Sequence, residues 1–159
     1  MTDWIESGDK APAFTLKDAE GNKHSLKEYA GRPVVIYFYP KDDTPGCTKE
    51  ACAFRDRYGE LLERDVVLLG VSADDAQSHQ KFTAKYELPF PLLVDDGFKY
   101  ATKLGAYREK NMYGKKSMGI QRSTFLIAPD GKIAKVWKRV KVDGHDQQVI
   151  DAVDALADA

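Results

Sequence analysis

The fold is decided by the stretch Val34-Val35-Ile36-Tyr37-Phe38-Tyr39-Pro40, in which every position before the proline is apolar. A continuous apolar run of this length is typical of a strand that is buried on both faces of a parallel sheet. A second run, Val66-Val67-Leu68-Leu69-Gly70-Val71, has the same character, and a predicted helix from Pro45 to Glu63 lies between the two. Strand, helix and strand within about 40 residues predict a parallel pair joined by a right-handed crossover.

Further elements are predicted on both sides of this unit. An N-terminal hairpin is indicated by an alternating stretch, a turn and a short second strand: Ala13–Leu16, Glu20-Gly21-Asn22-Lys23 and His24-Ser25-Leu26. Downstream we expect a helix, a short strand, a helical turn, an antiparallel hairpin and a closing helix: Asp75–Tyr86, Leu92–Val94, Tyr100–Leu104, Thr124–Ile127 with Ile133–Trp137, and Val149–Ala157. This order predicts an α/β, thioredoxin-like fold, a central mixed sheet flanked by helices with an N-terminal β-hairpin extension. Residues 1–159 are expected to form one domain.

The composition is that of an ordinary globular protein, since 43% of the residues are hydrophobic and 31% are charged. Lys plus Arg number 24 and Asp plus Glu number 25, a balance that gives no field for attracting nucleic acid or an anionic membrane. The basic run from Lys135 to Lys141 alternates with apolar residues, and we interpret it as a half-solvated strand. No apolar stretch approaches the roughly 20 residues that span a bilayer, and the first residues lack the pattern of a signal peptide, so a cytoplasmic protein is expected.

The two cysteines, Cys47 and Cys52, come shortly after the first buried strand. Reaction sites of open α/β sheets gather at that carboxyl edge. Thr44 suits the N-cap of the following helix and Pro45 suits its first position, which places Cys47 at the third. Free backbone N–H groups and the positive end of the helix dipole there favour a thiolate, the nucleophilic form of cysteine. The alternative is that both cysteines are small apolar fillers of a helix.

A fixed positive charge is predicted beside this sulfur. A thiolate that attacks a peroxide needs stabilisation of the charge that develops on the departing oxygen. Arg122 precedes the strand Thr124–Ile127, which we place antiparallel to the central strand, so Arg122 can reach Cys47 and offer it a fork of N–H donors. Glu50, one turn after Cys47, can hold the guanidinium in orientation. Taken alone, Arg122 is also interpretable as a surface arginine and Glu50 as an early-helix acid favoured by the dipole.

No metal site is expected from the three histidines. His24, His79 and His145 are scattered without the spacing of metal ligands, and two thiolates do not complete a tetrahedral zinc shell. His145 follows Asp143-Gly144 near the start of the last helix and is predicted to be a surface residue. The sequence therefore predicts neither a metal nor another cofactor.

The active-site region closely resembles that of a known family, the bacterioferritin-comigratory or Q-type peroxiredoxins. The resemblance is carried by Tyr37-Phe38-Tyr39-Pro40 through Thr44-Pro45-Gly46-Cys47-Thr48-Lys49-Glu50-Ala51-Cys52. A second signature of the family is similar to Gly119-Ile120-Gln121-Arg122-Ser123-Thr124-Phe125-Leu126-Ile127, and the opening Gly8-Asp9-Lys10-Ala11-Pro12-Ala13-Phe14 matches as well, so nearly the whole chain is covered. The Pro-x-x-x-Thr-x-x-Cys pattern is specific, and a second cysteine five residues on narrows it to this subgroup. The chain departs from the family at Ala128, where an acid is frequent, and at Ala106-Tyr107-Arg108, where a tryptophan is common.

The resemblance implies an atypical two-cysteine, thioredoxin-dependent peroxidase of antioxidant defence. Cys47 would be the peroxidatic cysteine and Cys52 the resolving one, joined in an intramolecular disulfide during turnover. Pro40, Thr44 and Arg122 would build the peroxide pocket, with Thr44 donating a hydrogen bond to the sulfur or to the peroxide. Hydrogen peroxide and organic hydroperoxides are the implied substrates, thioredoxin or a glutaredoxin-like dithiol protein is the implied reductant, and neither metal nor haem is needed. We expect a monomer.

Two other functions fit parts of the pattern. A thioredoxin-like disulfide oxidoreductase would share the fold, but that chemistry uses Cys-x-x-Cys at the helix start, and no proline precedes the Thr124 strand where thioredoxins carry one. A non-enzymatic redox sensor or holdase would use the same reactive cysteine. A turnover assay separates it from a peroxidase, because a sensor is oxidised once and stops.

Overall fold

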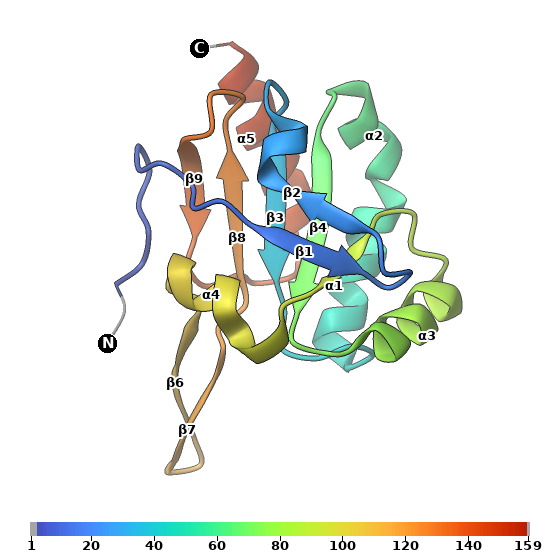
Figure 1. Ribbon diagram of the computed structural model, residues 1–159, viewed down its shortest axis with the longest axis vertical. Coiled ribbons are helices and arrows are strands. Elements are labelled where there is room, and N and C mark those ends of the chain that lie inside the picture. The colour runs from blue at the N-terminus through green and yellow to red at the C-terminus, as the bar shows by residue number, and fades with distance from the viewer. Residues whose placement is uncertain (1–2, 159) are drawn as a thin grey trace.

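The computed structural model describes residues 3–158, and its main sheet has seven strands in the order β2-β1-β5-β4-β3-β8-β9 (Figure 1). The strands are β1 (Thr15–Asp18), β2 (Lys23–Ser25), β3 (Val34–Phe38), β4 (Val67–Ser72), β5 (Leu92–Val94), β6 (Tyr107–Met112), β7 (Lys115–Ile120), β8 (Ser123–Ile127) and β9 (Ile133–Trp137). The helices are α1 (Pro45–Asp56), α2 (Tyr58–Glu63), α3 (Ala76–Tyr86), α4 (Lys99–Leu104) and α5 (His145–Ala157), with 3₁₀ turns at Leu26–Tyr29 and Asp96–Phe98. Between residues 3 and 158, no helix combines the length and apolar character that crossing a bilayer requires.

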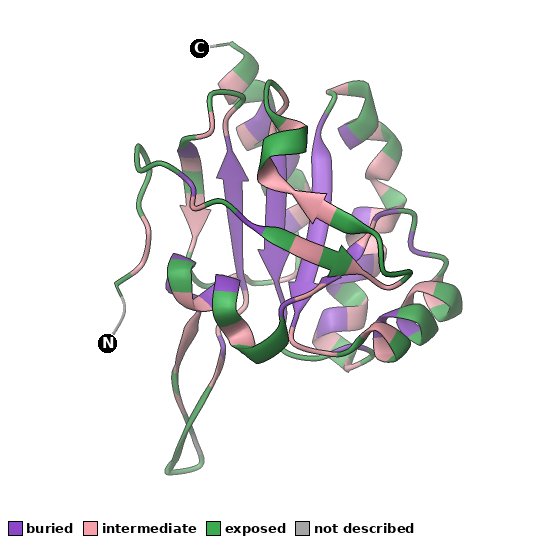
Figure 2. Ribbon diagram, in the orientation of Figure 1, coloured by how far each residue is buried: buried purple, intermediate pink, exposed green. Residues whose placement is uncertain are grey.

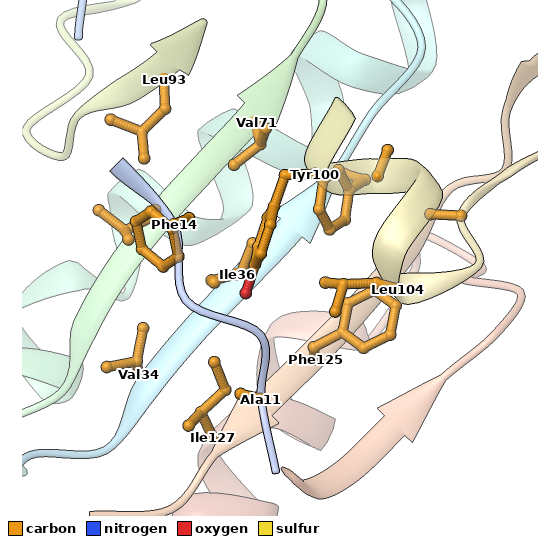
Figure 3. Close-up of a cluster of buried hydrophobic side chains, with 14 of the residues drawn as sticks. Ala11, Phe14, Val34, Ile36, Val71, Leu93, Tyr100, Leu104, Phe125 and Ile127 are labelled. Atoms are coloured by element: carbon orange, nitrogen blue, oxygen red, sulfur yellow. The ribbon is translucent and has the colours of Figure 1, made fainter. Parts of the chain in front are cut away.

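Strand β3 explains the layered architecture, because every one of its residues is buried (Figure 2). Val34, Ile36 and Phe38 face a cluster that also includes α4 and the N-terminal segment around Ala11 (Figure 3). The alternate residues of the strand face a second cluster on the opposite side, built with α1, α2, α3 and α5. A strand covered on both faces must be apolar throughout, which is the pattern of this sequence.

The topology brings the ends of distant segments to one edge of the sheet. Strand β3 pairs in parallel with β4, and β4 pairs in parallel with β5, as predicted for the crossover unit. On its other side β3 pairs antiparallel with β8, with Phe38 opposite Ser123. The end of β3, the start of α1 and the start of β8 therefore lie at the same edge, where the cysteine segment and Arg122 meet. The predicted thioredoxin-like arrangement, including the hairpins β1–β2 and β8–β9, is confirmed.

The helix predicted from Pro45 to Glu63 is wrong in one respect, because it is broken into α1 and α2 at Arg57. The Arg57 N–H donates to the carbonyl of Phe54, three residues back, in place of the bond to the fourth residue that would continue an α-helix. The Arg57 guanidinium turns to α5, where it contacts Asp146 at 3.0 Å. The same guanidinium also pairs with Glu60, three residues along the chain, so it makes one local contact and one distant contact.

Two other stretches differ from expectation. The exposed hairpin β6–β7 projects from the rest of the fold and was not predicted, because its many polar residues carry no burial pattern (Figure 1). The basic run interpreted as one strand from Lys135 to Lys141 is a strand only as far as Trp137. Beyond Trp137 the chain is irregular, and the Val140 N–H donates a hydrogen bond to the Arg122 carbonyl at 3.1 Å.

Candidate active site

The start of α1 is built as the residue types predict. Thr44 is the N-cap in extended conformation, Pro45 occupies the first helical position, and Cys47 the third. The Thr44 hydroxyl does not cap the helix, however, since it donates to the carbonyl of Lys41 at 2.9 Å. The first helical hydrogen bond is made by the main chain, from the Thr48 N–H to the Thr44 carbonyl at 2.8 Å. Cys47 is 2% exposed and lies in the first turn of α1, where the backbone N–H groups have no partner within the helix.

The Arg122 side chain comes from the start of β8 and contacts both predicted partners. Its Nη2 lies 3.3 Å from the Cys47 Sγ, and its Nη1 lies 2.7 Å from the Glu50 Oε1. Gly46 permits this approach, because a Cβ added there would lie 3.0 Å from Nη2. The guanidinium is thus fixed at one end by a buried carboxylate and presents its other end to the sulfur.

Burial sets the charge state of this pair. Burial raises the pKa of Glu50 to about 7, although the charge of Arg122 and its hydrogen bond act in the opposite direction. Burial acts to lower the pKa of Arg122, but the charges of Glu50 and Cys47 and the hydrogen bonds to both outweigh it, so this pKa is raised. Within the described part of the chain, the second carboxylate oxygen of Glu50 has no hydrogen-bond partner. Arg122 is therefore the permanent cation of this pair, and Glu50 is the partner whose pKa lies near neutral pH.

The other predicted site residues surround this core. Pro40 lies exposed just after β3, at the same sheet edge. Cys52 lies farther along α1, half-buried, and both cysteines are free thiols. Arg122 thus contacts both Cys47 and Glu50, whereas Thr44 is the N-cap of the helix and Cys52 is about 1.4 turns after Cys47.

The prediction for His145 is wrong, because it is 1% exposed rather than a surface residue. Its Nε2 lies 2.8 Å from the Thr124 hydroxyl and its Nδ1 lies 2.9 Å from the Gln148 amide oxygen. Its ring packs edge-on against Phe54 and Trp137. These partners come from four different segments, which is why the sequence around His145 gave no sign of burial.

A second buried histidine was also missed. His79 on α3 is fully buried and its Nδ1 lies 2.6 Å from a carboxylate oxygen of Asp42, in the loop that leads to Cys47. The one feature of the sequence that could have pointed to a buried partner for His79 was the acidic pair Asp42-Asp43, directly before Thr44 and next to the predicted reaction site. Among residues 3–158, no three His, Cys, Asp or Glu side chains gather as metal ligands would.

Comparisons with known proteins show the family to which the chain belongs. The model of the AhpC/TSA family matches residues 7–136. Peroxiredoxin Bcp of Bacillus subtilis is 48% identical over 154 residues, which cover 97% of this chain and 96% of the relative. A solved structure of the Xanthomonas campestris bacterioferritin comigratory protein, studied for its alkyl peroxide reduction activity, superposes with a TM-score of 0.88 at 38% identity and covers 99% of both chains. The Xylella fastidiosa PrxQ C47S mutant gives a TM-score of 0.91 at 33% identity, again over 99% of both chains.

Proposed function

The chain belongs to the AhpC/TSA family and is a thiol-dependent peroxidase, and we propose that Cys47 is the sulfur that its hydroperoxide substrate oxidises. The observation that carries this proposal is the contact of 3.3 Å between the Cys47 Sγ and the Arg122 Nη2. This contact adds a fixed cation to the free N–H groups at the start of α1, and both favour a thiolate.

In the peroxide step, the Cys47 thiolate attacks one oxygen of the hydroperoxide and the O–O bond breaks. The sulfur becomes a sulfenic acid, and the departing oxygen leaves as water or an alcohol after taking up a proton. Arg122 lies where negative charge passes from the sulfur to that oxygen, and Glu50 keeps its guanidinium in place. Thr44 takes part if its hydroxyl gives up its hydrogen bond to the Lys41 carbonyl and donates to the bound peroxide instead, and Pro40 is expected to border the peroxide.

In the resolving step, the Cys52 thiol attacks the Cys47 sulfur, a disulfide forms and water leaves. Residues five apart in an α-helix have Cα atoms about 8.7 Å apart, whereas a disulfide tolerates up to about 7 Å. The first turns of α1 must therefore unwind before the disulfide can form. Unwinding also exposes the disulfide to an external dithiol, which restores both thiols by exchange.

The proposal also covers the reductant, the range of hydroperoxide substrates and the cellular compartment. Thioredoxin or a glutaredoxin-like dithiol protein is the expected reductant, and hydrogen peroxide and alkyl hydroperoxides are the expected substrates, as alkyl peroxides are for the Xanthomonas relative. Because both cysteines must return to thiols in every cycle, the cycle suits a reducing cytoplasm. We further propose that residues 1–159 form one domain that acts as a monomer in antioxidant defence.

The test is peroxide consumption with a thioredoxin system, measured for the parent protein, Cys47→Ser and Cys52→Ser. We expect steady turnover in the parent and none in Cys47→Ser. Cys52→Ser should consume one equivalent of peroxide and then stop, because its sulfenic acid has no partner. Undiminished thioredoxin-linked turnover in Cys52→Ser would contradict the resolving role, and peroxide consumption by Cys47→Ser would contradict the peroxidatic one.

A further inference from the structure

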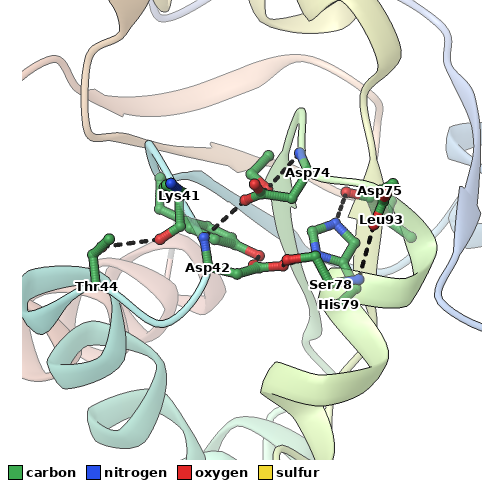
Figure 4. A network of polar contacts seen from close by, with 10 residues as sticks. Lys41, Asp42, Thr44, Asp74, Asp75, Ser78, His79 and Leu93 are labelled. Carbon is green, nitrogen blue, oxygen red and sulfur yellow. Dashed lines mark hydrogen bonds and ion pairs between the residues drawn. The ribbon is translucent and has the colours of Figure 1, made fainter.

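The loop between β3 and α1 is anchored by a buried acid, Asp42 (Figure 4). Its carboxylate accepts hydrogen bonds from the Tyr39 hydroxyl at 2.6 Å, from the Ser78 hydroxyl at 2.7 Å and from the His79 Nδ1 at 2.6 Å. The Asp42 main-chain N–H donates to the carboxylate of Asp74 at 2.8 Å. A single loop residue is therefore tied to the residue directly after β3, to α3 and to the segment after β4.

His79 is the group that makes this anchor an ion pair. Its Nδ1 faces the Asp42 carboxylate and its Nε2 lies 2.9 Å from the carbonyl of Leu93, which has no proton to donate. Both ring nitrogens therefore face oxygen acceptors, an arrangement that favours the doubly protonated imidazolium. Burial acts to lower the pKa of His79, but the hydrogen bond and charge of Asp42, the Leu93 carbonyl and the charge of Asp74 outweigh it, so this pKa is raised. The ring of Tyr39 lies beside the His79 ring, with the two ring centroids 6.5 Å apart.

The anchor is connected to the reactive sulfur through the loop itself. The contacts of Asp42 fix the peptide bond that joins it to Lys41. The carbonyl of that peptide bond accepts a hydrogen bond from the Thr44 hydroxyl at 2.9 Å. Thr44 in turn begins the helix that presents Cys47 at its third position. By contrast, the next loop residue, Asp43, contacts Lys85 and Tyr86 at the surface, where such pairs contribute little.

On the premise of the proposed function, we propose that His79 and Asp42 are positioning residues of the peroxidase. Their ion pair holds the Lys41–Thr44 loop, and thereby the start of α1, in the geometry in which Cys47 meets a peroxide. Neither residue touches the reacting atoms. The pair acts on the peroxide step alone, because the later disulfide forms only after the helix start has unwound. A displacement of about 1 Å at a reacting centre typically costs about 100-fold in rate.

The test compares two buried histidines. His79→Gln keeps one amide donor for Asp42 but removes the charge, and His145→Gln is the matched control, since His145 is equally buried and lies outside the Lys41–Thr44 loop. Stopped-flow oxidation by hydrogen peroxide should slow about 10- to 100-fold in His79→Gln and less than about 3-fold in His145→Gln. The rate at which thioredoxin reduces the oxidised protein should be unchanged in both, and both variants should keep the helicity of the parent in circular dichroism.

Two additional measurements keep the proposal testable if His79→Gln does not fold. Asp42→Asn preserves the shape of the side chain and removes the ion pair, so it should slow the peroxide step. Ser78→Ala removes one hydroxyl donor to the same carboxylate but keeps the ion pair, so it should not slow that step. Nitrogen NMR of the parent should show both ring nitrogens of His79 protonated at neutral pH. A neutral ring, or folded His79→Gln that is oxidised at the parent rate, overturns the proposal. If Cys47→Ser still consumed peroxide, the proposed function would fail instead, whatever His79 does.

Discussion

Replacing Arg122 with methionine removes the cation beside the reactive sulfur while keeping much of the side-chain volume. At 3.3 Å, a unit positive charge stabilises a unit negative charge by about 5 kcal/mol at an effective dielectric constant of about 20. Only the part of this stabilisation that Arg122 also gives to the departing oxygen in the transition state lowers the barrier. Loss of one such donor typically slows a reaction about 100- to 1,000-fold. We therefore expect oxidation of Arg122→Met by hydrogen peroxide to slow by that factor.

The effect on stability should be smaller and should depend on pH. Without Arg122, the buried Glu50 loses the contact that favours its charged form, so it keeps its proton over a wider pH range. A carboxyl group whose pKa is raised by folding contributes stability at low pH that is lost as the pH rises through that pKa. Below about pH 7 the variant should therefore unfold in urea close to the parent, and the difference should grow at higher pH.

Two variants complete this experiment. Arg122→Lys keeps a positive charge, but a single ammonium group cannot contact Glu50 and Cys47 together as the two guanidinium nitrogens do. Its rate of oxidation by peroxide should therefore lie between those of the parent and the methionine variant. Arg57→Met removes an arginine that pairs with Asp146 at 3.0 Å, away from the sulfur, and should leave the rate within about 2-fold. Stopped-flow rates of Arg122→Met within a few-fold of the parent would refute the reasoning.

Other perturbations test the helix start and the buried histidines. Gly46→Ala places a methyl group 3.0 Å from the guanidinium nitrogen at the sulfur, and we expect a roughly 10-fold slower peroxide step in stopped-flow measurements with little change in unfolding. Formation of the Cys47–Cys52 disulfide should reduce helicity by circular dichroism and speed amide exchange across residues 45–55; equal helicity in protein shown by mass to hold the disulfide would contradict this. The stability that charged His79 contributes is complete below about pH 6.5 and is lost as the pH rises through its raised pKa. Burial lowers the pKa of His145, so the stability that this residue contributes is lost as the pH falls below about 6.5. Urea unfolding of His79→Gln and His145→Gln should therefore diverge from the parent at opposite ends of the pH range, and parallel profiles would disprove this assignment.

The central part of the fold was predictable because its signals are local. The apolar run of β3 specifies a strand buried on both faces, and Pro45 with Thr44 before it specifies where the next helix begins. The crossover rule then placed β4, and the turn before Ile133 placed the β8–β9 hairpin. The approach of Arg122 to Cys47 followed from strand direction alone, since antiparallel pairing puts the start of β8 at the end of β3.

The sequence by itself determined that Cys47 lies at a helix start, because the residues that begin a helix are its neighbours in the chain, and it offered Arg122 as the cation able to reach that sulfur. Only the tertiary structure decided how polar groups are satisfied inside the protein. His79 and His145 are buried because Asp42 and Thr124, 37 and 21 residues away, supply their hydrogen bonds. A polar side chain is stable in the interior only when its partners are in place, and those partners are brought together by the fold rather than by the local sequence.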